Sequence, residues 1–534
     1  MGRIQGLASV SSGRPAYTPS AELSPQQLRI MAQVKDPLGG NLLVEARAGT
    51  GKTFTLLEIC KVLDGTATFL AFNKAISEEI KQRLAAAGIS DREVKASTMH
   101  SVGFQAWVRS DLGKRSARNV RGEKLRLLAD KIMVPKKFQG FAVAACSLAK
   151  QHVVGAVLDL PIDDTDSWLP LVEHYQLIDT YAPQSDWELD EEQFLEEALA
   201  WSLRLLKQSI VEAETLIDYD DMIYMPLYHN LRFWQYDWVL IDEAQDTNRA
   251  RREIAMRLLK PGGRLIAVGD PYQAIYGFTG ADADALDLIA AEFQCQRLPL
   301  TTTYRCAAAI VREAQKIVPD IEAREGAPEG VVESIELPIF QKIIPDPADA
   351  ILCRNTAPLV EIAFGYLRRR IGCVIEGKDI GASLISFVRR WKRPNNLGDL
   401  LIQLEEHLTS ETSRLLAQYK EAQAAALDDR VSTLRVLIKM LGYDQPISAL
   451  TELIDSMFKD SDKLPKQVIT LSTCHKAKGR EWDRVYLLGR NAYMPSAYAK
   501  QEWQLAQESN LEYVAITRAK HSLIHVVVPH KPRR

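Results

Sequence analysis

Short apolar runs alternate with longer amphipathic stretches over much of this chain. Leu42–Val44 precedes a helical pattern that starts at Thr53, and Thr68–Phe72 precedes a second helical pattern over Lys74–Ala86. A short apolar run is typical of a buried strand, whereas apolar positions three and four residues apart indicate a helix. The order strand, helix, strand, helix predicts an α/β fold with a parallel sheet covered by helices.

The alternation stops at about residue 109, where a mostly helical pattern begins that is first basic and then acidic. It resumes with the apolar runs Trp238–Ile241 and Arg264–Val268. We therefore expect a first domain formed by residues 21–108 and 206–297, interrupted by a helical insertion over 109–205. Residues 1–20 are rich in Ser, Gly and Pro, and we expect a mobile tail there.

A second α/β region begins near Leu298. Four apolar runs are its expected strands: Ala350–Cys353, Val468–Leu471, Val485–Leu488 and Leu523–Val528. A helical block interrupts them, with expected helices over Leu397–Leu408, Glu411–Ala425, Val431–Met440 and Ile447–Met457. The second domain is thus expected over 298–381 and 467–534, with a short helical insertion over 382–466. A chain of 534 residues is too long for one core, in agreement with this division.

Charge is segregated along the chain, although the net charge is only −3. Residues 109–137 hold ten Lys and Arg against three acids, and residues 368–393 hold eight against two. Residues 186–197 hold seven acids and no base, a run best read as solvated surface. The basic segments favour a groove for a polyanion, although residues 109–137 could equally be a solvated helix face.

The spacing of the cysteines and the hydropathy of the chain argue against a metal-cluster protein and a membrane protein. The seven cysteines include no C-x-x-C pair, which favours reduced thiols and argues against a zinc or iron–sulfur site. No apolar run approaches the ~18 residues of a membrane span, and the first residues contain no apolar signal core. We expect a cytoplasmic protein.

The candidate chemistry starts directly after the run Leu42–Val44, where a glycine-rich loop opens a helix. The loop reads Ala46-Arg47-Ala48-Gly49-Thr50-Gly51-Lys52-Thr53. Such a loop binds phosphates through backbone N–H groups, while Lys52 reaches the outer phosphates and the Thr53 hydroxyl ligates Mg²⁺. By itself the pattern indicates a nucleoside triphosphate site.

A pair of acids turns this nucleotide site into a hydrolysis site. Asp242 and Glu243 follow the apolar run Trp238–Ile241, and Asp242 lies 242 − 52 = 190 residues after Lys52. Asp242 is expected to hold the metal with Thr53, and Glu243 to polarise the attacking water. Arg305 and Arg518, both in the second α/β region, are expected to stabilise the developing charge from the opposite side.

The motifs, in this order, resemble superfamily 1 helicases of the UvrD/Rep type, with features of the F-box helicase and phage branches. Beyond the two motifs above, the segments that carry the resemblance are Leu23–Gln27, Phe72–Ala75, Thr98–Ser101, Asp218–Met222, Gly269–Ala281, Thr303–Arg305, Thr473–Trp482 and Glu508–Lys520. The resemblance implies two RecA-like P-loop domains, ATP and Mg²⁺ as cofactors, and translocation on single-stranded DNA in the 3′ to 5′ direction with unwinding of duplex.

The resemblance also implies roles for individual residues. On the nucleotide side, Gln27 would read adenine, Tyr304 would stack on it, Glu481 would meet the ribose and Gln273 would sense the γ-phosphate, with Arg518 as the arginine finger. The implied DNA contacts are Phe72, Asn73, Thr98, His100, Tyr276, Phe278 and His475. From composition alone, the two phenylalanines and two histidines could equally be core residues.

One departure from the family pattern lies at Phe278-Thr279, where the family has Trp-Arg. A DNA-dependent ATPase that displaces proteins, or a switch subunit of a repair or defence complex, is therefore the alternative to a helicase. The expected partners are single-stranded DNA and its junctions with duplex, bound by a monomer in a bacterial or phage-infected cell. Replication and repair are the implied processes.

Overall fold

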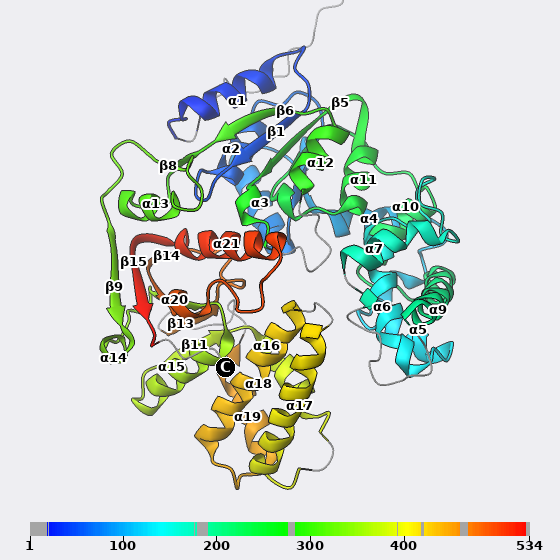
Figure 1. Ribbon diagram of the computed structural model, residues 1–534. Helices are drawn as coiled ribbons and strands as arrows, with labels where there is room; N and C mark the ends of the chain where they lie inside the picture. The colour runs from blue at the N-terminus through cyan, green and yellow to red at the C-terminus, as the bar shows by residue number, and fades with distance from the viewer. Residues whose placement is uncertain are drawn as a thin grey trace, which may run out of the picture.

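The computed structural model describes residues 19, 21–175, 177–178, 191–275, 284–391, 394–417, 421–459 and 468–529. Two sheets stand one above the other in Figure 1, and one helical block extends from each. Except for Pro19, the expected tail lies outside the described residues. Within the described part of the chain, no helix is both long and apolar enough to span a bilayer.

The first sheet has six strands, and all of their pairings are parallel. In spatial order they are β3 (Val94–Thr98), β2 (Ala67–Ala71), β4 (Tyr236–Ile241), β5 (Leu259–Gly269), β1 (Leu42–Ala46) and β6 (Gln296–Leu300). The parallel α/β prediction is confirmed for this half. The expected division after residue 297 falls inside β6, whose whole length pairs with β1.

Helices cover both faces of the first sheet. One apolar layer lies between the strands and α1 (Pro25–Lys35), α2 (Lys52–Cys60) and α3 (Lys74–Ala86). The other layer lies under α4 (Met99–Arg109), α10 (Asp221–Tyr228), α11 (Arg249–Leu258) and α12 (Ala285–Glu292). Strands buried on both faces explain why the sequence shows continuous apolar runs here instead of alternation.

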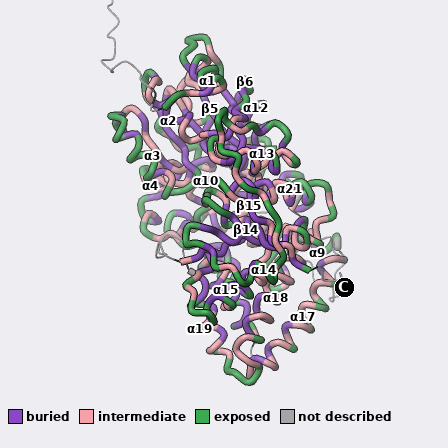
Figure 2. The backbone as a smooth tube through the Cα atoms, turned by 90° about the vertical axis from the view of Figure 1, so that its left-hand side faces the viewer, coloured by how far each residue is buried: buried purple, intermediate pink, exposed green. Residues whose placement is uncertain are grey.

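The second sheet has seven strands, again with parallel pairings throughout. In spatial order they are β12 (Phe458–Lys459), β11 (Cys373–Glu376), β13 (Ile469–Thr473), β10 (Ala350–Cys353), β14 (Trp482–Leu488), β15 (Ala519–Val527) and β9 (Val331–Glu336). The helices around it are α13 (Ala308–Ala314), α14 (Leu337–Phe340), α15 (Thr356–Arg368), α20 (Arg490–Tyr493) and α21 (Glu502–Ile516). Figure 2 shows buried residues following β14 through the middle of the molecule. A two-stranded ladder of β7 (Thr302–Thr303) and β8 (Glu322–Ala323) follows the first sheet in sequence.

The helical block of the second half contains α16 (Lys378–Val388), α17 (Leu397–Ala417), α18 (Glu421–Leu441) and α19 (Ile447–Met457). The expected helix ends at Leu408 and Ala425 are wrong, because α17 continues through Thr409 and Ser410 and α18 continues past Ala425. The Thr409 and Ser413 hydroxyls bond to carbonyls one turn earlier, so these polar residues do not break the helix. Leu400, Leu434 and Ile454 share one apolar core with the second sheet.

The core of the first half's helical block extends to Trp107 of α4 and Tyr224 of α10. The block contains α5 (Lys124–Lys131), α6 (Lys136–Gln151), α7 (Leu169–His174) and α9 (Glu191–Glu212). Phe138, Phe141 and Phe194 pack together at its centre. At the right of Figure 1 it stands beside α4 and α10 of the first half.

Buried charges connect this block to α10. Lys124 Nζ lies 2.6 Å from Asp221 Oδ2, and Lys150 Nζ lies 2.7 Å from Asp218 Oδ2 and 2.8 Å from Asp221 Oδ1. Lys124, Lys150 and Asp221 have no exposed side-chain surface. Burying four charges is costly unless each is paired, so this cluster requires α5, α6 and α10 in one arrangement.

Replacing Asp221 with Asn should destabilise the packing of α5 and α6 on α10 by about 3–5 kcal/mol, because two buried lysines lose a carboxylate. Hydrogen exchange of the α5 and α6 amides should accelerate, and mass spectrometry of peptides from these helices measures it. Asp130→Asn removes an exposed ion pair with Lys136 and should leave the exchange unchanged. Equal protection in both variants would show that the buried cluster does not hold the block.

Candidate active site at the junction of the two sheets

The glycine-rich loop lies between β1 and α2 and contacts the second half directly. Gly49 and Gly51 have φ angles of 72° and 83°, which side-chain-bearing residues rarely adopt. A Cβ on Gly49 would lie 2.5 Å from both Arg305 Cβ and Thr303 Oγ1. The backbone of residues 303–305 therefore packs on the loop, and Tyr304 N donates to Gly49 O at 2.8 Å.

The two acids lie at the end of β4, facing the start of α2. Thr53 Oγ1 donates to Asp242 Oδ2 at 2.7 Å, and Lys52 Nζ lies 3.2 Å from Glu243 Oε2. Glu243 has a left-handed backbone with a φ of 52°, which turns the chain out of the strand. The sequence motifs predicted that these four residues meet, and they do, although 190 positions separate Lys52 from Asp242.

Burial and neighbouring charge drive the pKa values of the two acids apart. Burial raises the pKa of Asp242 to about 6, and the adjacent Glu243 carboxylate adds to the rise. Burial also disfavours charge on Glu243, but Lys52 and Lys478 outweigh it and lower its pKa to about 2. Glu243 is thus an ionised carboxylate at neutral pH.

The oxygens of Thr53 and Asp242 suit a magnesium ion. Two adjacent ligands of an octahedral Mg²⁺ lie about 2.9 Å apart, since each Mg–O bond is ~2.1 Å long. The observed separation of 2.7 Å is close to that value. Among the described residues no cluster of three His, Cys, Asp or Glu side chains could hold a metal without further ligands. A Mg²⁺ ion here would need oxygens from phosphate and water, as it commonly does.

Both predicted arginines lie at the junction, in different environments. Arg305 Nε donates to Glu481 Oε2 at 2.7 Å, and Arg305 Nη1 donates to Thr517 O at 3.3 Å. Arg518 is 1% exposed, and its Nη1 donates to Arg480 O at 2.9 Å. Burial, with Arg305 nearby, lowers the pKa of Arg518 to about 9. The Arg305 guanidinium is thus held by a carboxylate and a carbonyl, and that of Arg518 by backbone carbonyls.

Further contacts close the junction around the loop. Ala48 N donates to Tyr513 OH at 2.8 Å, and Arg47 binds Asp320 through Nε and Nη2 at 2.8 and 2.6 Å. Sequence reasoning missed Tyr513 and Asp320, since neither lies in a pattern that indicates its partner.

Lys478 forms a second bridge across the junction. Its Nζ donates to Asp246 Oδ2 at 2.7 Å and to Gln273 O at 2.7 Å. The Lys478 and Asp246 side chains are only 9% and 3% exposed, so water hardly screens the pair. Asp246 belongs to the predicted acid motif, but its role here could not be read from sequence.

The remaining predicted nucleotide contacts bond to protein groups. Gln27 Nε2 donates to Thr55 Oγ1 at 3.0 Å, and Gln273 Nε2 donates to Asp270 Oδ2 at 2.6 Å. Tyr304 is 45% exposed beside the loop. Glu481 Oε1 lies 2.9 Å from Lys520 Nζ while its other oxygen accepts from Arg305.

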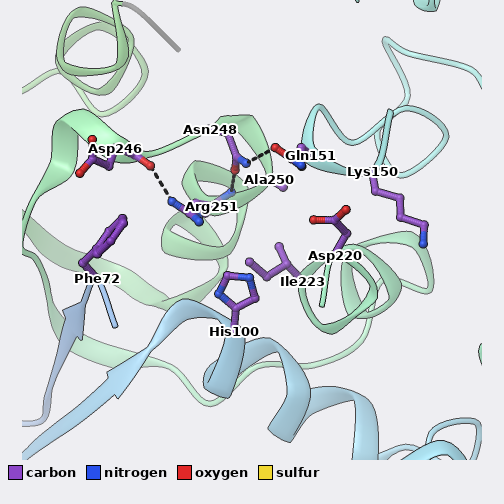
Figure 3. Close-up of a pocket in the computed structure, with 10 residues that line it drawn as sticks. All are labelled: Phe72, His100, Lys150, Gln151, Asp220, Ile223, Asp246, Asn248, Ala250 and Arg251. Carbon is purple, nitrogen blue, oxygen red and sulfur yellow. Dashed lines mark hydrogen bonds between the residues drawn. The ribbon is translucent and has the colours of Figure 1, made fainter. Parts of the chain in front are cut away.

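A separate cavity of about 280 Å³ lies at the ends of β2 and β3. Figure 3 shows Phe72 and His100, both predicted DNA contacts, facing it together with Arg251 and Asn248. Phe72 is 42% exposed. Burial, helped by Arg251, lowers the pKa of His100 to about 4, so the ring is neutral at pH 7.

Two other predicted DNA contacts are helix N-caps beside this cavity. Asn73 Oδ1 accepts from Ile76 N at 2.9 Å, and Thr98 Oγ1 accepts from Ser101 N at 3.1 Å. His475 does not line the cavity; its pKa falls to about 4 because it is buried close to Arg354. Tyr276 and Phe278 lie outside the described residues.

Asp246 links the cavity to the junction. Its carboxylate binds Lys478, its carbonyl accepts from Arg251 Nη1 at 2.5 Å, and it lines the cavity itself. Sequence reasoning missed Arg251 because no motif or charge run marked it. A cavity lined by an exposed aromatic ring, two cations and two carboxylates thus lies close to the acids of the hydrolysis site.

Comparison with known proteins places both halves in one family. Residues 23–294 match the UvrD/REP helicase N-terminal domain, and residues 388–528 match the UvrD-like helicase C-terminal domain. F-box DNA helicase protein 1 of Schizosaccharomyces pombe is 26% identical over 98% of this chain, and the match covers 59% of that protein. ATP-dependent DNA helicase UvrD2 of Mycobacterium tuberculosis is 24% identical over 90% of this chain and 75% of its own length. ATP-dependent DNA helicase Rep of Buchnera aphidicola is 26% identical over 53% of this chain and 42% of its own length.

Replacing Lys478 with Gln should open the junction, because a buried Asp246 loses its cation at a cost of about 3–5 kcal/mol. We expect an increased radius of gyration in small-angle X-ray scattering and at least a tenfold loss of ATP turnover. Lys342→Gln, at an exposed site outside the motif segments, serves as the control and should behave as the wild type. Wild-type scattering and turnover for Lys478→Gln would show that this pair does not hold the halves together.

Proposed function

Because this chain belongs to the UvrD/Rep helicase family, we propose that it is an ATP-dependent DNA helicase that moves along single-stranded DNA and separates duplex. The observation that supports this most strongly is the junction, where Arg305 of one half packs on the glycine-rich loop of the other. A nucleotide on that loop would contact both halves. Its binding and hydrolysis would therefore change how they fit together.

The hydrolysis mechanism follows from the residues of the first half. Backbone N–H groups of the loop and the N-terminus of α2 bind the phosphates, and Lys52 neutralises their charge. Glu243, ionised and held by Lys52 and Gln245, is positioned to orient the attacking water and accept its proton. Thr53 and Asp242 would hold Mg²⁺, which neutralises charge on the phosphate oxygens when bound.

The second half supplies positive charge for the transition state. Arg305 is tethered by Glu481 while its Cβ lies against the loop, so release from Glu481 is proposed to free its guanidinium for the terminal phosphate. Arg518 is already buried and preorganised by backbone carbonyls, which reduces the reorganisation needed during reaction. Gln27, Gln273 and Glu481 are proposed to position the nucleotide after giving up the protein contacts they now make, and the exposed Tyr304 ring is proposed to stack on adenine.

The DNA strand is proposed to cross the cavity beside the junction. Phe72 offers an exposed ring for base stacking, and Arg251 offers positive charge, whereas the Lys150 amine is held by Asp218 and Asp221. Because His100 is neutral, it would contact the DNA strand through a hydrogen bond and not through an ion pair with a phosphate. Asn73, Thr98, Tyr276, Phe278 and His475 remain proposed contacts, and movement from 3′ to 5′ by a cytoplasmic monomer is proposed from the family alone.

Lys52→Ala and Glu243→Gln each test the hydrolysis mechanism. Glu243→Gln removes the base at nearly constant size, so DNA-stimulated ATP turnover should fall by about 10²–10⁴ while nucleotide affinity is retained. Lys52→Ala should lose both affinity and turnover. Lys35→Ala, at the exposed end of α1, is the control. Near-normal turnover in either active-site variant would contradict the mechanism.

Replacing Arg305 with Ala tests the contribution from the second half. Loss of an arginine that stabilises the transition state should lower turnover by about 10³ or more. Fluorescent-nucleotide titration should show nearly unchanged affinity. Arg305 is a cleaner test than Arg518, whose removal would also take away the side-chain donor of the Arg480 carbonyl. An equal loss of affinity and turnover would assign Arg305 to nucleotide binding instead.

Strand separation distinguishes this proposal from a translocase or ATPase switch that opens no duplex. Duplexes with matched 3′ and 5′ tails, each as DNA and as RNA, are compared with and without ATP. We expect ATP-dependent separation of the 3′-tailed DNA. Streptavidin displacement without strand separation would favour a translocase, and ATPase activity that appears only with a protein partner would favour a switch.

A further inference from the structure

A second cavity, of about 270 Å³, lies on the first half away from the junction. It is bounded by Lys95 near the start of β3, Tyr236 at the start of β4 and Arg109 at the end of α4. Asp242 and Phe72 instead follow the ends of their strands. Because the strands are parallel, Lys95 and Tyr236 lie at the amino ends of the strands, opposite the carboxyl ends that Asp242 and Phe72 follow. We call this cavity the rear pocket.

The rear pocket concentrates positive charge that the protein leaves unneutralised. Arg92, Arg109 and Arg232 line it and are exposed, and within the described part of the chain none of them has an ion pair. The acid there, Asp91, lies 3.5 Å from Lys81, which competes for its charge. Burial lowers the pKa of Lys95, and Arg109 and Lys81 add to that fall. A pocket with this excess of positive charge attracts a polyanion.

Aromatic surface accompanies this charge. Trp234 is 68% exposed at the rim, whereas Tyr236 is buried in the wall. An exposed indole has no role in the core, but it offers a flat face on which any nucleobase can stack. The three guanidinium groups come from separate segments, before β3, at the end of α4 and before β4, which suits several phosphates in a row better than one compact anion.

We propose that the rear pocket binds single-stranded nucleic acid, through phosphates on Arg92, Arg109 and Arg232 and a base stacked on Trp234. Base stacking and phosphate contacts carry little sequence information, so binding is sequence-tolerant. His100 of the junction-side cavity lies near the start of α4 and Arg109 at its end. The helix has 11 residues and is about 16 Å long, so one rigid element joins the two sites.

The first experiment follows tryptophan fluorescence as oligothymidylate is added without nucleotide. We expect quenching in the wild type that is largely lost in Trp234→Phe. Trp503→Phe removes another tryptophan with 44% exposure, far from the rear pocket in sequence, and should keep the quenching. Unchanged quenching in Trp234→Phe would overturn the stacking contact.

The second experiment measures the salt dependence of binding to a long oligothymidylate. The triple variant Arg92→Gln, Arg109→Gln, Arg232→Gln should reduce the slope of log K against log salt by about 2, since each phosphate contact on a single strand contributes ~0.7. Arg29→Gln, Arg324→Gln and Lys342→Gln together remove three exposed charges elsewhere and should leave the slope unchanged. Equal slopes for both triple variants would overturn the proposal.

Two further measurements distinguish nucleic-acid binding from protein docking and from misfolding of the variants. A peptide of aspartates ending in phenylalanine replaces the oligonucleotide; quenching by the peptide but not by oligothymidylate would make the rear pocket a protein-docking site and overturn the proposal. ATP turnover stimulated by a short oligonucleotide is measured in the same variants and should be unchanged, which also shows that they fold. Because binding is measured without ATP, failure of the helicase mechanism would leave this test intact.

Discussion

The packing of residues 303–305 on the glycine-rich loop is the contact on which the rest of this structure depends. It brings a cation of one half to the phosphate-binding backbone of the other, at a place where even a methyl group on Gly49 would not fit. The Ala48 N–H group donates to Tyr513 from across the junction. A loop that takes hydrogen-bond partners from the opposite half cannot change shape without moving that half.

The charged groups near the loop form a connected series. Lys52 holds Glu243, Lys478 lowers the pKa of Glu243 while binding Asp246, and Asp246 reaches Arg251 in the cavity of Figure 3. Lys478 and Asp246 would therefore respond both to a strand in the cavity and to protonation or rearrangement of Glu243. This arrangement gives a physical route for DNA to influence hydrolysis, which double-mutant cycles can measure.

Local sequence patterns predicted the parts of the fold whose cause is local. Buried parallel strands give continuous apolar runs, and a glycine-rich loop before a helix has few other uses, so both sheets and the Lys52, Thr53, Asp242 and Glu243 cluster could be expected. Pairings such as Arg47 with Asp320 depend on long-range packing and leave no mark in a single sequence. The helix ends expected at Leu408 and Ala425 were wrong, because packing in the core of the second half carries α17 and α18 through these positions.

The two helical blocks differ in what fastens them to the sheets. The second shares a continuous apolar layer with its sheet, and sliding it would expose hydrocarbon to water. The first shares apolar packing with α4 and α10, through Trp107 and Tyr224, and is held there in addition by buried lysine–aspartate pairs. Turning it against the first sheet would separate packed hydrocarbon and leave buried charges without partners, so two independent kinds of contact fix its orientation.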